Sequence, residues 1–387
     1  MSTRPSSRQD VPARTVESLG LRDPALEPVA EAVLDGRRLS REEALAAATT
    51  GDLLGLGRLA NIVREQLHGT ATYFNVNRHL NPTNVCAASC ALCAFYVPWR
   101  RADEGWTYTV EEALRVVERD MDPSVTELHI VGGLHPRLGV EYWEELFRAI
   151  KERFPWVHIK ALTMVELDFY ASVSRIGLDE LIERLKAAGL GSCPGGGAEI
   201  FAPRAREIIC DHKVSGDRWL EVAWTVHGHG LKTNCTMLYG HVETAEERVD
   251  HLLALRELQD ETGGFQCFIP LAFHPENTRL DHLPPAGGVL DLQTIAMARL
   301  VLDNVPHVKA YWVMLGEKIA QLAQLFGADD LDGTIVDERI TRAAGGTAGR
   351  GMSRRRLEHL IREAGRVPVE RDTLYNPVNA TSGAPAA

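Results

Sequence analysis

The chain has 387 residues, of which 45% are hydrophobic and 25% are charged, and its formal net charge is −11. This composition is typical of a soluble globular protein. The acidic balance argues against nucleic-acid binding, because it implies no basic surface that could displace phosphate counterions. The N-terminus has no apolar signal segment, and no uninterrupted apolar run of about 18 residues occurs. We therefore expect a cytoplasmic protein that is not exported and does not cross a membrane.

The two ends of the chain are predicted to be additions to a central domain. Residues 1–20 are rich in Ser, Arg, Pro and Asp, and we expect them to be disordered. Residues 21–73 form a helical segment, in which Ser40 and Glu43 fit a capping box before an alanine-rich helix. Residues 346–387 are predicted to form one further helix and a tail.

Between these ends, residues 74–345 carry the pattern of a parallel α/β barrel. Short β-branched segments alternate with amphipathic helices, which is typical of βαβ units. Two of the helices follow capping boxes that begin at Thr109 and Thr244. We predict a (β/α)8 TIM-type barrel, with a six-unit open barrel as the alternative. The eight strand candidates lie near residues 74–80, 127–131, 158–162, 190–193, 232–239, 264–270, 307–312 and 330–333.

The segments that follow these strands are unusually rich in glycine and polar residues. In parallel barrels the active site lies at this end, where strands finish and loops begin. The opposite strand ends carry little of this kind, so we predict one functional rim. Its segments read NPTNVCAASCALCAF, VGGLHP, TMVE, CPGGGAEIF, MLYGHVE, LAFHPEN, YWVML and DLDGT.

A cysteine cluster after the first strand predicts an iron–sulfur site. Cys86, Cys90 and Cys93 have the spacing C-x3-C-x2-C. Three thiolates on one short loop can hold three irons of a cubane and leave the fourth iron without a protein ligand. A zinc site is the alternative, but structural zinc usually takes four protein ligands. We therefore predict a [4Fe–4S] cluster.

At this point the sequence resembles the radical S-adenosylmethionine (SAM) superfamily, whose hallmark is this cysteine motif. The resemblance implies that SAM chelates the open iron, and that one electron cleaves SAM into methionine and a 5′-deoxyadenosyl radical. It implies an electron donor such as flavodoxin or ferredoxin. It also implies that the backbone of Gly132 and Gly133 lies against the methionine end of SAM, and that Phe95 lies near the adenine.

Other segments resemble enzymes of the futalosine route to menaquinone and their relatives in deazaflavin synthesis. These segments are GGLHP, PGGGAE, YGHVET and LQDETGG. Two families of that route share them, the aminofutalosine synthases and the dehypoxanthine futalosine cyclases. HLNPTN, PLAFHPEN, KAYWVM and DDLDGT resemble the synthases, whereas Phe95-Tyr96 resembles the cyclases and Cys193 stands where leucine is expected.

The synthase resemblance implies a reaction. The 5′-deoxyadenosyl radical adds to the enolpyruvyl double bond of 3-[(1-carboxyvinyl)oxy]benzoate, an aromatic dicarboxylate. Rearrangement and loss of carboxylate then give 6-amino-6-deoxyfutalosine for menaquinone biosynthesis. The alternatives are the cyclase, which abstracts hydrogen from its substrate, and a non-catalytic Fe–S or zinc binding module.

A dicarboxylate substrate needs donors or cations in a desolvated site, because an unpaired buried charge is very costly. His79 and Asn84 lie at the end of the first strand, beside the cysteines. His274 lies at the end of the sixth strand. We expect donors from these three side chains to reach the substrate carboxylates, with local hydrogen bonding as the alternative for each.

Two carboxylates and a glycine complete the predicted site. Glu199 is the preferred partner of the SAM ribose hydroxyls, while Glu166 is assigned to substrate or ribose against the alternative of a surface salt bridge. Gly196 and its glycine neighbours allow the backbone to approach a ligand closely.

The remaining histidines and cysteines are given structural roles. His227 and His229 fall near the end of a predicted helix, where a cation complements the helix dipole. This interpretation is favoured over metal binding. The scattered cysteines are interpreted as small buried hydrophobes; they are Cys193, Cys210, Cys235 and Cys267.

Overall fold

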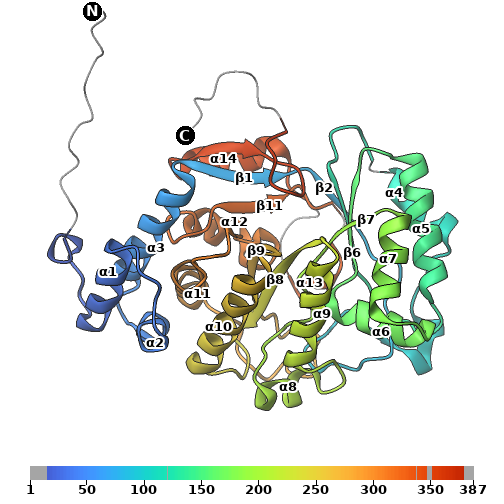
Figure 1. Cartoon of the computed structure of the whole chain (residues 1–387), viewed down its shortest axis with the longest axis horizontal. Helices are drawn as coiled ribbons and strands as arrows, with labels where there is room; N and C mark the ends of the chain where they lie inside the picture. The colour runs from blue at the N-terminus through green and yellow to red at the C-terminus, as the bar shows by residue number, and fades with distance from the viewer. Residues whose placement is uncertain (1–14, 120, 337, 347–350, 379–387) are drawn as a thin grey trace, which may run out of the picture.

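The computed structural model describes residues 15–119, 121–336, 338–346 and 351–378, and it is built around a curled parallel sheet (Figure 1). Seven strands lie in the order β10-β9-β8-β7-β6-β5-β2, and every neighbouring pair is parallel. The strands are β2 (Asn77–Leu80), β5 (Glu127–Ile130), β6 (His158–Ala161), β7 (Leu190–Cys193), β8 (Lys232–Tyr239), β9 (Phe265–Ala272) and β10 (His307–Val308).

An eighth strand position closes the barrel. Strand β11 (Asp330–Gly333) pairs in parallel with β1 (Ala71–Asn75), which leads directly into β2. A bridge between Lys309 and Asp330 joins β11 to the β10 side. The α/β barrel is therefore confirmed, with a strand at each predicted position and the first of them divided into β1 and β2.

Helices cover the outside of the sheet, and several begin where the sequence places a cap. Ser40 and Thr244 form the expected capping boxes at α2 and α10, and Thr163 forms a further one with Glu166 at α6. The barrel helices are α4 (Val110–Arg119), α5 (Val140–Arg153), α6 (Met164–Ser174), α7 (Leu178–Ala188), α8 (Pro203–Cys210), α9 (Gly216–Gly228), α10 (Ala245–Thr262), α11 (Gly288–Val301), α12 (Trp312–Ala323) and α13 (Ile340–Ala343).

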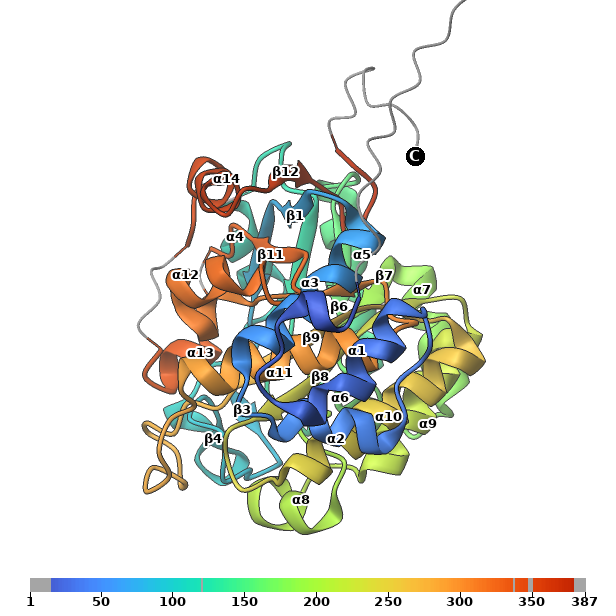
Figure 2. The same ribbon diagram turned by 90° about the vertical axis from the view of Figure 1, so that its left-hand side faces the viewer.

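The N-terminal helices lie together on one side of the barrel (Figures 1 and 2). They are α1 (Glu27–Leu34), α2 (Arg41–Thr49) and α3 (Leu53–His68), preceded by the short 3-10 helices η1 (Glu17–Leu19) and η2 (Pro24–Leu26). Helix α2 packs on α10 and α3 packs on α11. Residues 1–14 of the segment expected to be disordered lie outside the described residues. None of the described helices combines the length and the apolar character needed to cross a bilayer.

The C-terminal segment forms more than the predicted helix and tail. Helix α14 (Arg354–Glu363) is followed by β12 (Val367–Glu370), which pairs in parallel with β1. In Figure 2, α14 and β12 lie at the end of the molecule opposite the cysteine loop, which carries β3 (Val85–Cys86), β4 (Val97–Pro98) and the 3-10 helix η3 (Trp99–Glu104). Strand β12 was not predicted from the sequence. Its valine–proline–valine run is short and lies outside the alternating strands and helices of the barrel.

Candidate active site

A cavity of about 330 Å³ occupies the interior of the barrel and reaches the rim where the strands end. Cys86, Cys90 and Cys93 all line it, as do the glycine-rich segments after β5 and β7. The predicted functional rim and the cavity therefore coincide.

The cysteine loop is held by backbone contacts with the loop after β5. The Leu134 amide donates to Cys86 Sγ at 3.3 Å, and the Ala87 amide donates to the Leu134 carbonyl at 2.8 Å. The three thiols are free of disulfides. Burial raises the pKa of Cys86, and it raises that of Cys90 to about 12. Burial has the same effect on the structural cysteines, so these shifts do not distinguish metal ligands; what sets the three thiols apart is that they share one loop and one cavity.

The glycine loop after β5 touches the cysteine strand rather than open space. The Gly133 amide donates to the Thr83 carbonyl at 2.9 Å. A Cβ atom on Gly133 would overlap the carbonyl oxygen of Val85, one residue before Cys86. Glycine is therefore required here by the backbone of the cysteine strand, independently of any contact with SAM.

Glu166 braces the same loop from α6. Its carboxylate accepts the Gly132 amide at 3.0 Å and the Thr163 amide at 2.7 Å. The side chain is buried and lines the cavity, and burial raises its pKa. Glu166 is buried and pairs with none of the described cations, which corrects the alternative of a surface salt bridge.

Glu199 reaches the cavity together with a lysine that sequence analysis did not identify. Its carboxylate pairs with Lys213 Nζ, and both side chains line the cavity. Burial alone would raise the pKa of Glu199, but the adjacent ammonium group outweighs burial and lowers it. Lys213 lies between α8 and α9, away from any strand end, so strand-end reasoning could not find it.

Gly196 and Phe95 also line the cavity. The nearest atom to a Cβ built on Gly196 is Cγ2 of Thr163 at 3.3 Å, so the backbone there is open towards the cavity. Phe95 is 8% exposed and meets Trp106 edge to face, with ring centroids 5.5 Å apart.

His79 lines the cavity, but the other two predicted substrate donors do not. Asn84 Oδ1 accepts the Trp106 amide at 2.8 Å, which ties the start of the cysteine loop to its end. His274 Nε2 lies 3.0 Å from the carbonyl oxygen of Met314. For both, the structure shows the local hydrogen bond that was the alternative.

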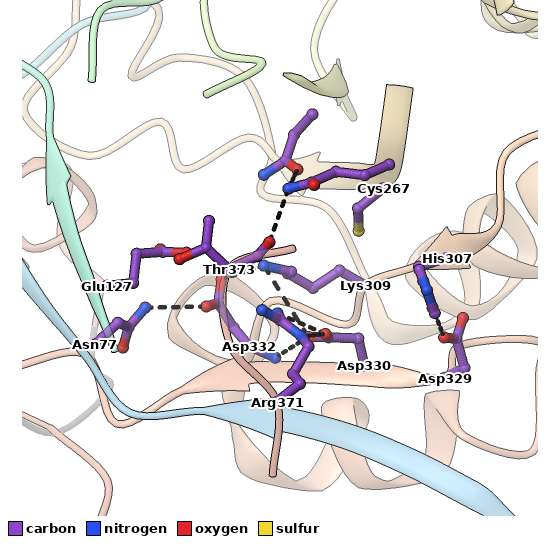
Figure 3. Close-up of polar contacts among 12 residues, drawn as sticks. Asn77, Glu127, Cys267, His307, Lys309, Asp329, Asp330, Asp332, Arg371 and Thr373 are labelled. Atoms are coloured by element: carbon purple, nitrogen blue, oxygen red, sulfur yellow. Dashed lines mark hydrogen bonds and ion pairs between the residues drawn. The ribbon is translucent and has the colours of Figure 1, made fainter. Parts of the chain in front are cut away.

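Deeper in the barrel, charged side chains from different strands meet. Lys160 Nζ lies 2.8 Å from Glu127 Oε2, and Lys309 Nζ lies 3.0 Å from Asp332 Oδ2. All four line the cavity. Glu127 and Lys160 stand within strands β5 and β6, so a pattern of residues that follow strands does not point to them. Lys309 follows β10 directly, and Asp332 belongs to the predicted DLDGT segment, but neither pairing is visible in the sequence. Figure 3 shows Lys309, Asp332 and Arg371 gathered around Asp330.

The arrangement fits an iron–sulfur cubane with one open iron. Three thiols from one loop face a single cavity, and among the described residues no fourth cysteine lines it. The cavity continues past two glycine segments and a buried lysine–carboxylate pair, which are suited to a zwitterionic, hydroxyl-bearing cofactor such as SAM. Beyond these, the cavity is lined by the charged side chains of Glu127, Lys160, Lys309 and Asp332.

Comparison with known proteins matches almost the whole chain. The family model described as Radical SAM superfamily matches residues 80–255, and the one described as CofH/MqnC C-terminal region matches residues 262–383. Aminodeoxyfutalosine synthase of Thermus thermophilus is 46% identical over 93% of this chain and 97% of its own length. The protein of that description from Streptomyces coelicolor is 44% identical over 91% and 93%. Cyclic dehypoxanthine futalosine synthase of Streptomyces coelicolor is 40% identical over 90% and 88%.

Solved structures share the fold at low sequence identity. Methylornithine synthase PylB matches with a TM-score of 0.70 and 14% identity, over 88% of this chain and 97% of its own. The FeFe-hydrogenase maturase HydG from Carboxydothermus hydrogenoformans matches with a TM-score of 0.66 and 17% identity, over 90% and 80%.

Proposed function

The chain belongs to the radical SAM superfamily, in the group that carries the CofH/MqnC C-terminal region, and from this we propose that it catalyses the aminofutalosine synthase reaction. It adds the 5′-deoxyadenosyl group of SAM to 3-[(1-carboxyvinyl)oxy]benzoate and yields 6-amino-6-deoxyfutalosine for menaquinone biosynthesis. The observation that carries this proposal is the 46% identity to a synthase over 93% of the chain, against 40% to a cyclase.

Cys86, Cys90 and Cys93 hold the [4Fe–4S] cluster, and SAM is consumed as a co-substrate. When bound, the reduced cluster supplies the electron that releases the 5′-deoxyadenosyl radical from SAM. A small electron-transfer protein such as flavodoxin or ferredoxin is the proposed donor. Because the three cysteines line a buried cavity at its rim, a cluster that they hold would lie where a reactive radical is kept from solvent.

The SAM-facing roles fall to residues that line the cavity. Gly132 and Gly133 present backbone near the methionine end, with Glu166 holding the Gly132 amide in place. Gly196 and Glu199 face the ribose, and Phe95 faces the adenine. Because Lys213 neutralises Glu199, the pair offers both an acceptor and a donor to a zwitterionic ligand.

The substrate occupies the deeper part of the cavity. Of the three donors expected from the sequence, His79 is the one we assign to the substrate, since Asn84 and His274 make local contacts outside the cavity lining.

The test is anaerobic turnover with SAM labelled at its 5′ carbon. The expected result is label bound covalently in an aminofutalosine-like product, detected by mass spectrometry. Cys90→Ala serves as the inactive control. Label found only in free 5′-deoxyadenosine, with the enolpyruvyl benzoate unconsumed and the cyclase substrate turned over, overturns the proposal.

A further inference from the structure

Two stacked histidines form a distinct part of the cavity wall. His79 on β2 and His129 on β5 are register partners in neighbouring parallel strands. Their ring centroids are 4.7 Å apart with an angle of 19° between the ring planes, and both line the cavity. Neither imidazole makes a hydrogen bond to any described residue, and the nearest acid is Glu127, whose Oε1 lies 3.9 Å from His129 Nδ1. Their ring nitrogens are therefore available to a ligand.

The lysines of the cavity, by contrast, are already paired. Lys160 pairs with Glu127, Lys309 with Asp332, and Lys213 with Glu199. A carboxylate entering the deep part of the cavity would compete with a protein carboxylate for each ammonium group. An anion in a desolvated site needs a compensating charge. Among the described residues His79 has no carboxylate within ion-pair distance, and the one near His129 is Glu127 at 3.9 Å, which is already paired with Lys160 at 2.8 Å.

Burial favours the uncharged form of both imidazoles, and an anion bound against them would favour a proton. The groups that face them are Glu127 on β5, Lys160 on β6, Lys309 after β10, Asp332 on β11 and Glu338 after β11. Burial lowers the pKa of both histidines, and that of His129 is lowered further by its neighbour His79. A carboxylate bound against the rings would give a protonated imidazole a direct partner of opposite charge and so offset the effect of burial.

Across the barrel the wall carries apolar side chains, beside Asn234 and Thr236 of β8. Strand β9 lies opposite β5 in the ring of strands, and Ile269 and Leu271 of β9 line the cavity together with Leu238 of β8. A flat ring can pack on these side chains while a group at its edge reaches the histidines. The site thus fits an aromatic carboxylate.

We propose that His79 and His129 together bind the ring carboxylate of the substrate, and that one of them takes up a proton from solvent as the carboxylate enters. The inference rests on the proposed function for the identity of the substrate. It adds His129 and the proton linkage, and it leaves the enolpyruvyl carboxylate, which is lost in the reaction, to the end of the cavity near the cysteines.

The first test uses calorimetry on the cluster-loaded, unreduced enzyme with SAM present, so that no turnover occurs. The enolpyruvyl benzoate is titrated at pH 7.5 in buffers of different ionisation enthalpy, beside the analogue that lacks the ring carboxylate. We expect uptake of close to one proton for the benzoate and close to none for the analogue. Equal proton uptake for the two ligands, or none for a benzoate that binds, overturns the proposal.

The second test combines enzyme variants with the same two ligands. His79→Gln and His129→Gln should each weaken the benzoate roughly 10- to 100-fold, as expected for loss of a charge-assisted hydrogen bond. Their affinity for the analogue should change little. His229→Gln, on the outer surface, is the matched control. A loss of equal size for both ligands would indicate a general packing role and refute a carboxylate site.

These outcomes are separable from the proposed function. Iron content and the cluster spectrum show whether a variant is folded and loaded, and the wild-type calorimetry needs no variant. If the benzoate binds with proton uptake but labelled SAM gives no adduct, the proposed reaction fails while the carboxylate site stands.

Discussion

The two ends of the barrel use buried charge differently. At the rim, thiols, glycine backbone and the Lys213–Glu199 pair border an open cavity. At the opposite end, Asp330 is paired with Arg371, and Asp329 is held by Arg299 and by His307 at 2.6 Å. Figure 3 shows these acids facing side chains of the chain itself. Buried polar groups that satisfy one another stabilise a fold, whereas those facing a cavity remain available to ligands. Substitutions at the rim should therefore affect iron loading and activity, whereas substitutions at the opposite end should affect the free energy of unfolding.

The largest effect is expected at the rim. Cys90→Ala should abolish iron loading and activity, because the three thiols are the proposed protein ligands of the cubane. Iron content and the visible spectrum after anaerobic reconstitution measure this. Cys210→Ala is the matched control, since Cys210 is buried nearby but does not line the cavity. If Cys210→Ala bleached the cluster as fully as Cys90→Ala, the assignment of three ligands would be wrong.

At the opposite end the expected loss is in stability. Arg371→Met leaves the fully buried Asp330 without its main partner, which costs about 3–5 kcal/mol for a broken buried pair. The free energy of unfolding from denaturant titration is the measurement. Turnover per loaded cluster should stay close to that of the wild type.

The same C-terminal segment provides the control for that experiment. Arg354→Met breaks the pair with Glu370, in which the arginine side chain is 43% exposed, and should cost less than about 1 kcal/mol. Equal losses for Arg371→Met and Arg354→Met would contradict the view that the buried end is a stability element.

A smaller effect separates two glycines of the rim. Gly133→Ala should destabilise the protein by roughly 1–3 kcal/mol and lower its iron content, because the new methyl group overlaps the Val85 carbonyl beside Cys86. Gly196→Ala meets only the Thr163 methyl group, so iron content should be normal and SAM affinity reduced. Normal stability and iron loading in Gly133→Ala would refute the packing argument.

The contrast between the ends also explains what could be predicted from the sequence. Strands, helix caps and the cysteine motif are each defined by residues that are contiguous in the sequence. The barrel and the cysteine loop could therefore be predicted from the sequence. Lys160, Glu127 and His129 come together only through strand register, which a single sequence does not specify. Lys213 lies in a loop whose sequence carries no recognisable motif, and its pairing with Glu199 is visible only in the structure. Strand β12 forms by pairing with β1, far away in the sequence, so its own residues did not predict it.

Two histidines, His227 and His229, lie at the C-terminal end of α9. The sequence suggested that His227 and His229 both act as cations there. His229 does pair with Asp179 and Glu183, and hydrogen bonds to them raise its pKa. That expectation is wrong for His227: burial lowers its pKa to about 4, and it hydrogen-bonds Thr262 and Thr233 as a neutral ring.

The two rings should therefore respond to pH with opposite sign. For His227 the folded pKa of about 4 lies below the unfolded value of about 6.5, so its contribution to stability is complete above pH 6.5 and declines as pH falls. The destabilisation caused by His227→Gln should then be smaller at pH 5 than at pH 7, by at most about 2 kcal/mol, or 1.4 kcal/mol per pH unit. His229→Gln should instead cost more at pH 5, because a raised pKa stabilises below the unfolded value and is lost as pH rises. Denaturant titrations at both pH values measure the four differences. The same pH trend in both variants would mean that His227 is charged in the folded protein, contrary to its buried neutral contacts.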